Sequence, residues 1–140
     1  MMDRYPVANP LLLITAVALI DEEKRVLVQL RPEGKPLAGL WEFPGGKVEQ
    51  GEVADAALVR ELQEELSIDV KKGDLEPFTF ACEPLADRQL LLLLYVCRTW
   101  SGVPKPLVAS ELKWCRFEEL AQLAMPPADV PLLKQLRHVL

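Results

Sequence analysis

Apolar runs separated by short polar segments give the first view of how this chain folds. We expect strands at 11–20, 25–30, 41–43, 77–82, 89–98 and 112–117. The charged tetrapeptide 21–24 separates the first two runs, which predicts a hairpin. The segment 31–40 contains two prolines and two glycines, so we expect a loop there.

A helical period replaces the strand pattern at 52–66. Leu58, Leu62 and Leu66 recur at every fourth position, which places them on one apolar stripe. Shorter helices are expected at 118–123 and 130–140, separated by a segment with two prolines. Strands flanked by helices at separated points along the chain predict an α/β fold, with a mixed sheet and helices on its faces. The length of 140 residues favours a single domain, 1–140.

Composition narrows the possible partners. The net charge of −5 argues against binding a nucleic-acid polymer, although carboxylate-bound cations can still attract a small anionic substrate. No apolar run approaches the roughly 20 residues of a membrane span. Three cysteines without CxxC spacing are expected to be buried thiols of a reducing, cytoplasmic environment. The oligomeric state stays open between monomer and homodimer.

Three glutamates give the helix at 52–66 its candidate chemistry. Glu61, Glu64 and Glu65 are spaced i, i+3 and i+4, so they share one face. Like charges at this spacing destabilise an isolated helix by about 0.2–0.5 kcal/mol per pair, and a bound cation removes that penalty. Mg²⁺ prefers such oxygen ligands. The alternative is an ordinary solvated acidic face.

A glycine pair precedes this helix. Gly45 and Gly46 allow a close backbone approach, so a loop carbonyl can be presented to the carboxylates. The segment is not a phosphate-binding Walker A loop, because Glu52 stands where that motif needs lysine. Arg60 lies beside the acidic residues and is expected to pair with Glu52 as a structural brace.

These residues together resemble the Nudix box. The matching positions are Gly46, Glu52, Arg60, Glu61, Leu62, Glu64, Glu65 and Ile68. Ser67 replaces the family's glycine, and we expect an altered turn there without loss of a ligand. The segment 41–47, Trp-Glu-Phe-Pro-Gly-Gly-Lys, further resembles the MutT branch, whose members hydrolyse oxidised nucleoside triphosphates.

The resemblance implies a Nudix fold, an α/β/α sandwich with a central mixed β-sheet. It implies that Mg²⁺, or Mn²⁺, binds the Gly46 carbonyl together with Glu61, Glu64 and Glu65, with Glu52 in support. Metal ions would neutralise the phosphate chain and activate a water. The base would be one of these glutamates or a hydroxide generated at the metal.

One departure concerns the base. The MutT pattern places a glutamate six residues before the tryptophan that is Trp114 here, and Val108 occupies that position. Glu111 is the nearest acidic residue and is a candidate replacement if the loop is shifted.

The substrate-binding candidates come from the same resemblance. Arg31 matches an arginine that contacts phosphate, and Lys47 is a second candidate. Both positions are also compatible with ordinary solvated side chains. Phe43 is a candidate for lining the base pocket, or simply for packing in the core.

Asp129 stands where MutT relatives carry an asparagine that reads the nucleobase. An ionised carboxylate only accepts hydrogen bonds, so it favours a guanine-type edge or a cytosine amino group. The alternative is that Asp129 caps the final helix.

The sequence therefore predicts an Mg²⁺-dependent hydrolase that converts a nucleoside triphosphate to (d)NMP and pyrophosphate. Its leading expected role is to remove oxidised nucleotides such as 8-oxo-dGTP. A CTP or dCTP pyrophosphohydrolase is the alternative within the family. A non-catalytic Nudix-fold recognition module is the rival from another class.

Overall fold

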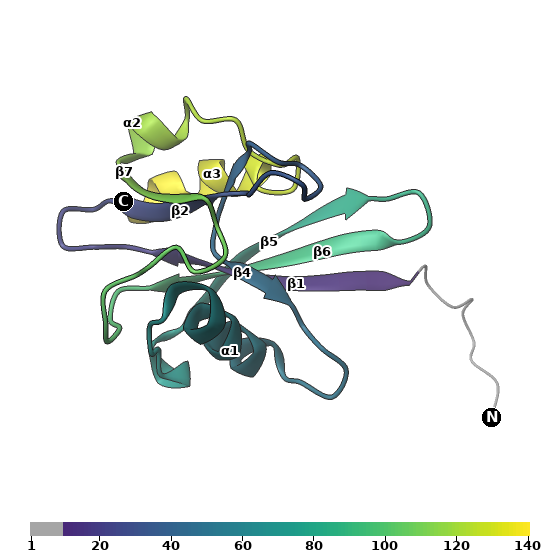
Figure 1. Ribbon diagram of the computed structural model, residues 1–140, viewed down its shortest axis with the longest axis horizontal. Helices are drawn as coiled ribbons and strands as arrows, with labels where there is room; N and C mark the ends of the chain where they lie inside the picture. Colours follow the sequence, from purple (N-terminus) through teal and green to yellow (C-terminus); the bar gives the residue numbers. More distant parts are fainter. Residues whose placement is uncertain (1–9) are drawn as a thin grey trace.

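A four-stranded sheet forms the centre of the computed structural model, which describes residues 10–140 (Figure 1). Its strands run in the order β4, β1, β6, β5. Their bounds are Gly45–Lys47, Leu11–Leu19, Gln89–Cys97 and Glu76–Pro84. Strands β1 and β6 are parallel, and the other two pairs are antiparallel. The expected mixed sheet is confirmed.

The second half of strand β1, residues 15–19, is buried on both faces because a hydrophobic cluster covers it on each side. Ala16 and Ala18 point into one hydrophobic cluster. Val17 and Leu19 point into the other. The sequence of a strand covered on both faces is a continuous apolar run rather than an alternation of apolar and polar residues.

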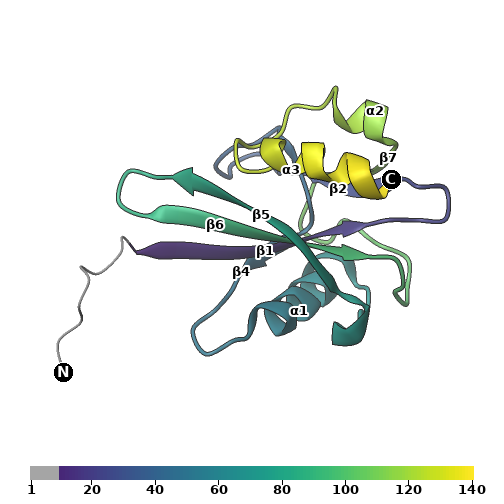
Figure 2. The ribbon, with the colours of Figure 1, turned by 180° about the vertical axis from the view of Figure 1, so that it is seen from behind.

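Helices cover both faces of this sheet. Helix α1, Ala54–Leu66, packs on one face through the predicted leucine stripe. The short helix α2, Phe117–Leu120, and helix α3, Val130–Leu136, lie on the opposite side (Figures 1 and 2). The 3₁₀ turn η2, Arg137–Val139, continues α3. The predicted α/β/α arrangement is confirmed. No helix among the described residues has the length and apolar character needed to cross a membrane.

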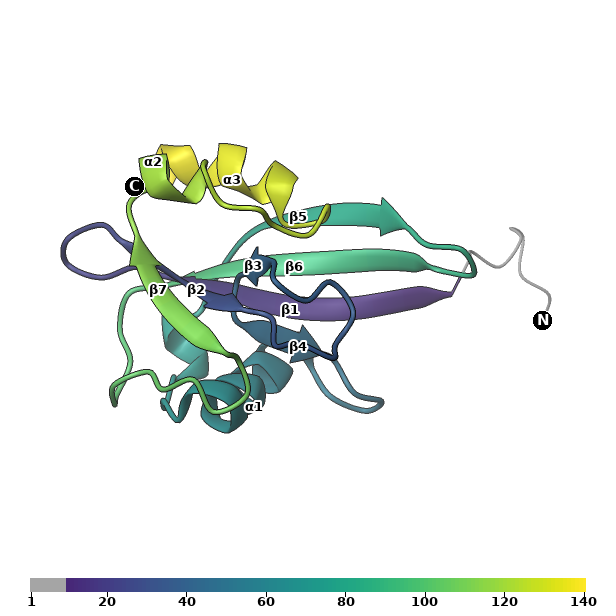
Figure 3. The same cartoon turned by 45° about the horizontal axis from the view of Figure 1, so that its top comes forward.

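A second sheet, absent from the sequence prediction, lies beside the first (Figure 3). It contains β3, Trp41–Glu42, β2, Val26–Leu30, and β7, Glu111–Cys115, in the order β3, β2, β7. The expected hairpin between the first two strands is therefore wrong. The only pairing of the two segments is a single bridge between Ile20 and Val26, and β1 and β2 belong to different sheets. Strand β2 cannot extend the pairing because β6 and β4 already occupy the two edges of β1.

The ends of α1 also differ from expectation. The helix begins at Ala54 rather than at 52, because the Glu52 carboxylate accepts a hydrogen bond from the Glu49 N–H and closes a turn first. At the other end Ser67 adopts the left-handed conformation, with φ 59° and ψ 37°. Its N–H and that of Ile68 donate to the Gln63 and Leu62 carbonyls. The altered turn expected at Ser67 is therefore wrong, since serine adopts the conformation that glycine favours.

The 3₁₀ turn η1, Lys72–Asp74, leads into β5. Cys97 and Cys115 are buried as expected, whereas Cys82 is exposed on β5, an edge strand. The expectation of three buried thiols is therefore wrong for Cys82.

Candidate metal centre and substrate cavity

Arg60 organises the acidic face of α1. Its guanidinium holds both oxygens of Glu52, with Nε 2.8 Å from Oε2 and Nη2 2.9 Å from Oε1. Nη1 donates to Glu61 Oε1 at 3.1 Å and to Glu64 Oε2 at 3.2 Å. Nη2 also donates to the Lys47 carbonyl at 3.2 Å, which ties the helix to strand β4. The Arg60–Glu52 pair expected from the sequence is present.

This arrangement gives the carboxylates different pKa values. The Arg60 guanidinium, helped by the Glu49 N–H, lowers the pKa of Glu52 to about 2. Burial raises the pKa of Glu61, while Arg60 opposes that rise and Glu64 adds to it. Burial also raises the pKa of Glu65 to about 7. The charge of Glu61 adds to the rise at Glu65, and the Gln29 side chain and Gly45 N–H oppose it.

Gly46 is required by the close packing of β4 on α1. A Cβ at this position would collide with the Glu61 carboxylate. A Cβ at Gly45 would collide with the backbone of Thr15 on β1. The Gly46 carbonyl accepts a long hydrogen bond, 3.4 Å, from the Thr15 hydroxyl. The two glycines therefore let β4 pack closely on β1 and on the Glu61 side chain of α1.

The donor set fits a hard divalent cation. It consists of oxygen atoms, and Glu65 Oε2 is buried without a hydrogen-bond partner among the described residues. Within residues 10–140 no three acidic, histidine or cysteine side chains yet surround one point closely enough to hold a metal. Arg60 instead neutralises Glu61 and Glu64. A bound cation would draw these carboxylates together and, with Arg60, neutralise their charge.

A cavity of about 570 Å³ opens beside this centre. The four predicted substrate-binding residues all line it, namely Arg31, Phe43, Lys47 and Asp129. Gly46 and Glu65 form its wall on the α1 side, whereas Glu52, Glu61 and Glu64 are outside its lining. Phe43 has only 3% of its surface exposed, so it serves both the core and the cavity. Residues from both sheets and from the segment before α3 therefore meet in one space.

Asp129 points into this cavity rather than capping α3. It is the N-cap residue, but its side chain makes no capping hydrogen bond. Its Oδ2 accepts from the Phe43 N–H at 3.2 Å instead. Burial raises the pKa of Asp129 to about 7, with the Phe43 N–H opposing and Glu42 adding to the rise. The capping alternative is therefore wrong.

Arg31 is anchored by a residue that sequence reasoning did not single out. Its Nη1 lies 2.9 Å from Glu42 Oε2, and its Nε donates to the Pro36 carbonyl at 2.7 Å. Gln29, paired with Glu42 across β2 and β3, donates to the other Glu42 oxygen at 3.5 Å. The available signal was a lone polar residue, Gln29, inside the apolar run of β2.

The replacement proposed for Val108 does not reach the centre. Val108 lines a smaller cavity of about 180 Å³ together with Glu65. Glu111 lies exposed on β7 opposite Leu30 and lines neither cavity that contains Glu65. Its expected role as a substitute acid is therefore not supported by its position.

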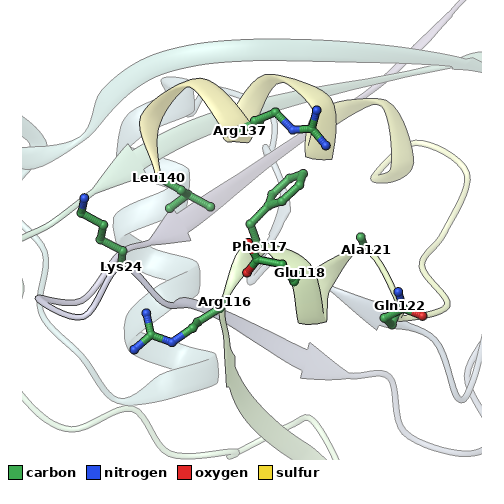
Figure 4. A pocket seen from close by; sticks show the side chains of 8 residues that line it. All are labelled: Lys24, Arg116, Phe117, Glu118, Ala121, Gln122, Arg137 and Leu140. Atoms are coloured by element: carbon green, nitrogen blue, oxygen red, sulfur yellow. The ribbon is translucent and has the colours of Figure 1, made fainter.

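A separate cavity of about 600 Å³ lies away from α1, between the turn at Lys24, α2 and the end of the chain (Figure 4). Arg116 and Arg137 line it, and the Arg137 guanidinium stacks 5.0 Å above the Phe117 ring. No site residue predicted from the sequence lines this space. The candidate chemistry is confined to the cavity beside α1.

Comparisons with known proteins agree with this geometry. The NUDIX domain family matches residues 11–136. The CTP pyrophosphohydrolase of Escherichia coli strain K12 is 38% identical over 117 residues, which cover 84% of this chain and 85% of that protein. The 8-oxo-dGTP diphosphatase of the same strain is 31% identical over 125 residues, or 89% and 95% of the two chains.

A solved structure matches over a similar extent. The MutT NUDIX hydrolase from Burkholderia pseudomallei superposes with a TM-score of 0.80 at 25% identity, covering 91% of this chain and 98% of that one. The acidic face of α1, the glycine pair against it and the domain match over residues 11–136 agree with one another. The chain therefore belongs to the Nudix family of hydrolases, as the motif in its sequence indicated.

Proposed function

We propose that this protein hydrolyses a nucleoside triphosphate to the nucleoside monophosphate and pyrophosphate, with oxidised nucleotides such as 8-oxo-dGTP as its leading substrates. The observation that carries the proposal is the single cavity of about 570 Å³ that joins Glu65 and Gly46 to Asp129 and Phe43. A phosphate chain at the first pair and a base at the second would occupy its two ends. Relatives named 8-oxo-dGTP diphosphatase support this choice.

The metal-binding residues follow from the donor set. Nudix hydrolases generally use a divalent metal, and we propose Mg²⁺, with Mn²⁺ as a substitute. Glu61, Glu64, Glu65 and the Gly46 carbonyl would hold it. Glu52 would support them through Arg60. When bound, the ion supplies positive charge to the phosphate oxygens and lowers the pKa of water.

The chain's own side chains orient the substrate. Arg31 and Lys47 line the cavity as cations and would bind phosphate oxygens, with Glu42 fixing the Arg31 guanidinium. The buried carboxyl of Asp129, which accepts from the Phe43 N–H, would form hydrogen bonds with the base edge. We place the reaction in the cytoplasm, on a free nucleotide rather than on a nucleic-acid polymer.

A CTP or dCTP pyrophosphohydrolase is a second candidate, because a specific residue and a relative both favour it. Asp129 is suited to accept a hydrogen bond from a cytosine amino group. The relative at 38% identity carries the name CTP pyrophosphohydrolase. Steady-state kinetics with 8-oxo-dGTP, dGTP, CTP and dCTP in Mg²⁺ will separate the two. A preference for ADP-ribose or a dinucleoside polyphosphate would contradict both.

The Glu64→Gln variant tests whether the acidic helix is catalytic. We expect it to lower kcat by about 100-fold or more, because it removes a carboxylate ligand of the proposed metal ion, whose positive charge stabilises the transition state. EDTA should abolish the wild-type activity. Glu118→Gln, an exposed glutamate at the separate cavity, is the matched control and should retain activity. Wild type and Glu64→Gln both inactive on every nucleotide would favour a non-catalytic recognition module.

A further inference from the structure

The separate cavity beside α2 carries positive charge that the proposed reaction does not use. Of the eight residues in the described part of the chain that line it, Lys24, Arg116 and Arg137 are basic and Glu118 is acidic. The protein as a whole has a net charge of −5. Cationic side chains therefore collect in one cavity of an acidic protein, which points to a partner of opposite charge.

None of these three cations is neutralised by a carboxylate of residues 10–140, since none forms a salt bridge there. Two acidic residues close to them have other partners. Glu23 Oε2 lies 3.6 Å from the Arg25 guanidinium. Glu119 Oε1 accepts a hydrogen bond from the Arg116 backbone N–H at 3.1 Å. A carboxylate from outside this part of the chain would therefore meet cations that are still available for pairing.

Local contacts hold both guanidinium groups of the cavity in place. Arg116 Nη1 donates to the Glu23 carbonyl at 3.0 Å, which leaves its remaining N–H groups for other acceptors. The Arg137 guanidinium lies 5.0 Å from the centre of the Phe117 ring, in a cation–π contact. Side chains that are already held lose less conformational entropy when a partner binds. The two arginines are therefore suited to binding an anionic group.

An apolar surface separates the cations of this cavity. The half-buried side chains of Phe117 and Leu140 line its centre. Figure 4 shows the head groups of Lys24 and Arg116 to one side of the Phe117 ring. The Arg137 guanidinium lies at the other side of that ring. A compact anion such as a phosphate ion would meet the cations of one side alone, whereas an extended chain can span both sides and cover the apolar surface between them.

We propose that the separate cavity is a docking site for an acidic peptide segment of a partner protein, in which carboxylates flank an apolar side chain. One carboxylate pairs with Arg116 and Lys24, and a second pairs with Arg137, because guanidinium groups bind carboxylates through two parallel hydrogen bonds. The apolar side chain packs on Phe117 and Leu140. This site is independent of the proposed hydrolysis, since it shares no lining residue of the described chain with the substrate cavity.

A synthetic peptide tests the site directly. The probe is the fluorescein-labelled peptide Asp-Asp-Leu-Asp-Asp-Leu-Asp-Asp, followed by fluorescence anisotropy in EDTA, so that no metal ion links its carboxylates to α1. We expect saturable binding with a Kd below about 1 mM in ~50 mM salt, and about tenfold weaker binding in ~500 mM salt, because salt screens the charges. A matched peptide with serine in place of both leucines should bind about tenfold more weakly, because it loses the apolar contact.

Substitution of the two arginines tests where the peptide binds. A double variant with Arg116→Gln and Arg137→Gln should bind the leucine peptide about tenfold more weakly, because it loses both guanidinium pairs. Both side chains are exposed, so we expect the double variant to fold, and circular dichroism checks this. Lys47→Gln, at the substrate cavity, is the matched control and should bind like the wild type. In the wild type, the peptide should shift the amide NMR resonances of 116–122 and 137–140.

Several outcomes would overturn the docking site while leaving the proposed hydrolysis untouched. The first is a wild type that does not bind the leucine peptide. Equal affinities for the two peptides, or for the wild type and the double variant, would show attraction by overall charge alone. Pyrophosphate that displaces the labelled peptide at a lower concentration than the unlabelled peptide does would assign the cavity to a small anion. A wild-type dimer that Arg137→Gln dissociates, seen by sedimentation, would assign it to a second copy of this chain.

Discussion

Burial gives the Asp129 carboxyl two accessible protonation states near neutral pH. Its pKa is raised to about 7, chiefly because the surrounding cavity wall excludes water. The protonated form can donate and accept hydrogen bonds, whereas the ionised form only accepts. An ionised Asp129 was expected from the sequence, and its raised pKa widens the range of base edges that this residue can recognise.

Asp129→Asn should change how stability depends on pH. The folded pKa lies above the unfolded value of about 3.9, so the folded state keeps a proton that the unfolded state has lost. This residue therefore lowers the free energy of unfolding as pH rises from about 4 to about 7, by up to about 4 kcal/mol. Urea unfolding at pH 5 and pH 8 will measure the free energy of unfolding of the wild type and the variant. The stability of Asp129→Asn relative to the wild type should be greater at pH 8.

The exposed residue Asp87 supplies the control for this measurement. Its side chain is 85% exposed, so Asp87→Asn should show the same difference from the wild type at both pH values. An Asp129→Asn difference that does not change between pH 5 and pH 8 would show that Asp129 is ionised throughout.

At the scale of elements, the end of α1 carries strain in one residue. Ser67 has a φ of 59°, a conformation that disfavours every side chain. Ser67→Gly should stabilise the protein by about 1 kcal/mol, because glycine adopts this conformation without the steric penalty. Thermal unfolding of the wild type and Ser67→Gly will measure this gain in stability. Ser110→Gly is the control: Ser110 is exposed and has a negative φ, so glycine there should not stabilise.

The acidic face of the same helix depends on Arg60 for its charge balance. Arg60→Gln should lower the melting temperature in EDTA by several degrees, since Glu52, Glu61 and Glu64 lose their shared cation. Added Mg²⁺ should raise the melting temperature of the variant more than that of the wild type. The folded pKa of Glu52, about 2, lies below its ordinary value. The difference between the proteins in EDTA should therefore shrink as pH falls from about 5 toward 2.

Equal melting temperatures for the wild type and Arg60→Gln in EDTA would contradict this account. Arg98→Gln is a suitable control, because Arg98 is exposed and, among residues 10–140, its side chain donates only to the Val139 carbonyl. Scanning calorimetry on the three proteins, with and without Mg²⁺, makes the comparison.

Local patterns in the sequence predicted most of these elements. The leucine stripe gave α1, and the apolar runs gave β1 and β6, because burial imposes those patterns directly. The spacing of Glu61, Glu64 and Glu65 predicted their shared face, because residues three and four apart are neighbours on a helix surface. The roles of Gln29 and Glu42 could not be predicted, since they depend on the pairing of β2 with β3. Which strands pair depends on the whole fold and not on the local sequence. For the same reason the second sheet could not be predicted from the sequence.

At the scale of the whole molecule, the substrate cavity draws its walls from distant parts of the chain. Its lining includes Leu37 from the loop after β2, Arg88 from the turn between β5 and β6, and Pro126 before α3. No single element forms the cavity. A bound nucleotide should therefore restrain several segments at once.

Hydrogen exchange can test this coupling. With Mg²⁺ and a non-hydrolysable triphosphate, we expect slower exchange at 37–43, 85–90 and 128–130. Residues 117–122, beside the separate cavity, serve as the internal control and should be unaffected. Protection limited to the α1 region would show that the nucleotide contacts the metal centre alone.

The parallel pairing of β1 with β6 sets the order in which this enzyme can become active during synthesis. Leu11 lies opposite Gln89, and Leu19 lies opposite Cys97, so the central pair of strands cannot close until most of the chain exists. Asp129 comes later still. Contacts this distant in sequence make folding slow compared with local helix formation. A ribosome-bound chain that has already formed α1 would therefore present the acidic helix without a cavity, and it would hydrolyse nothing until its last quarter emerged.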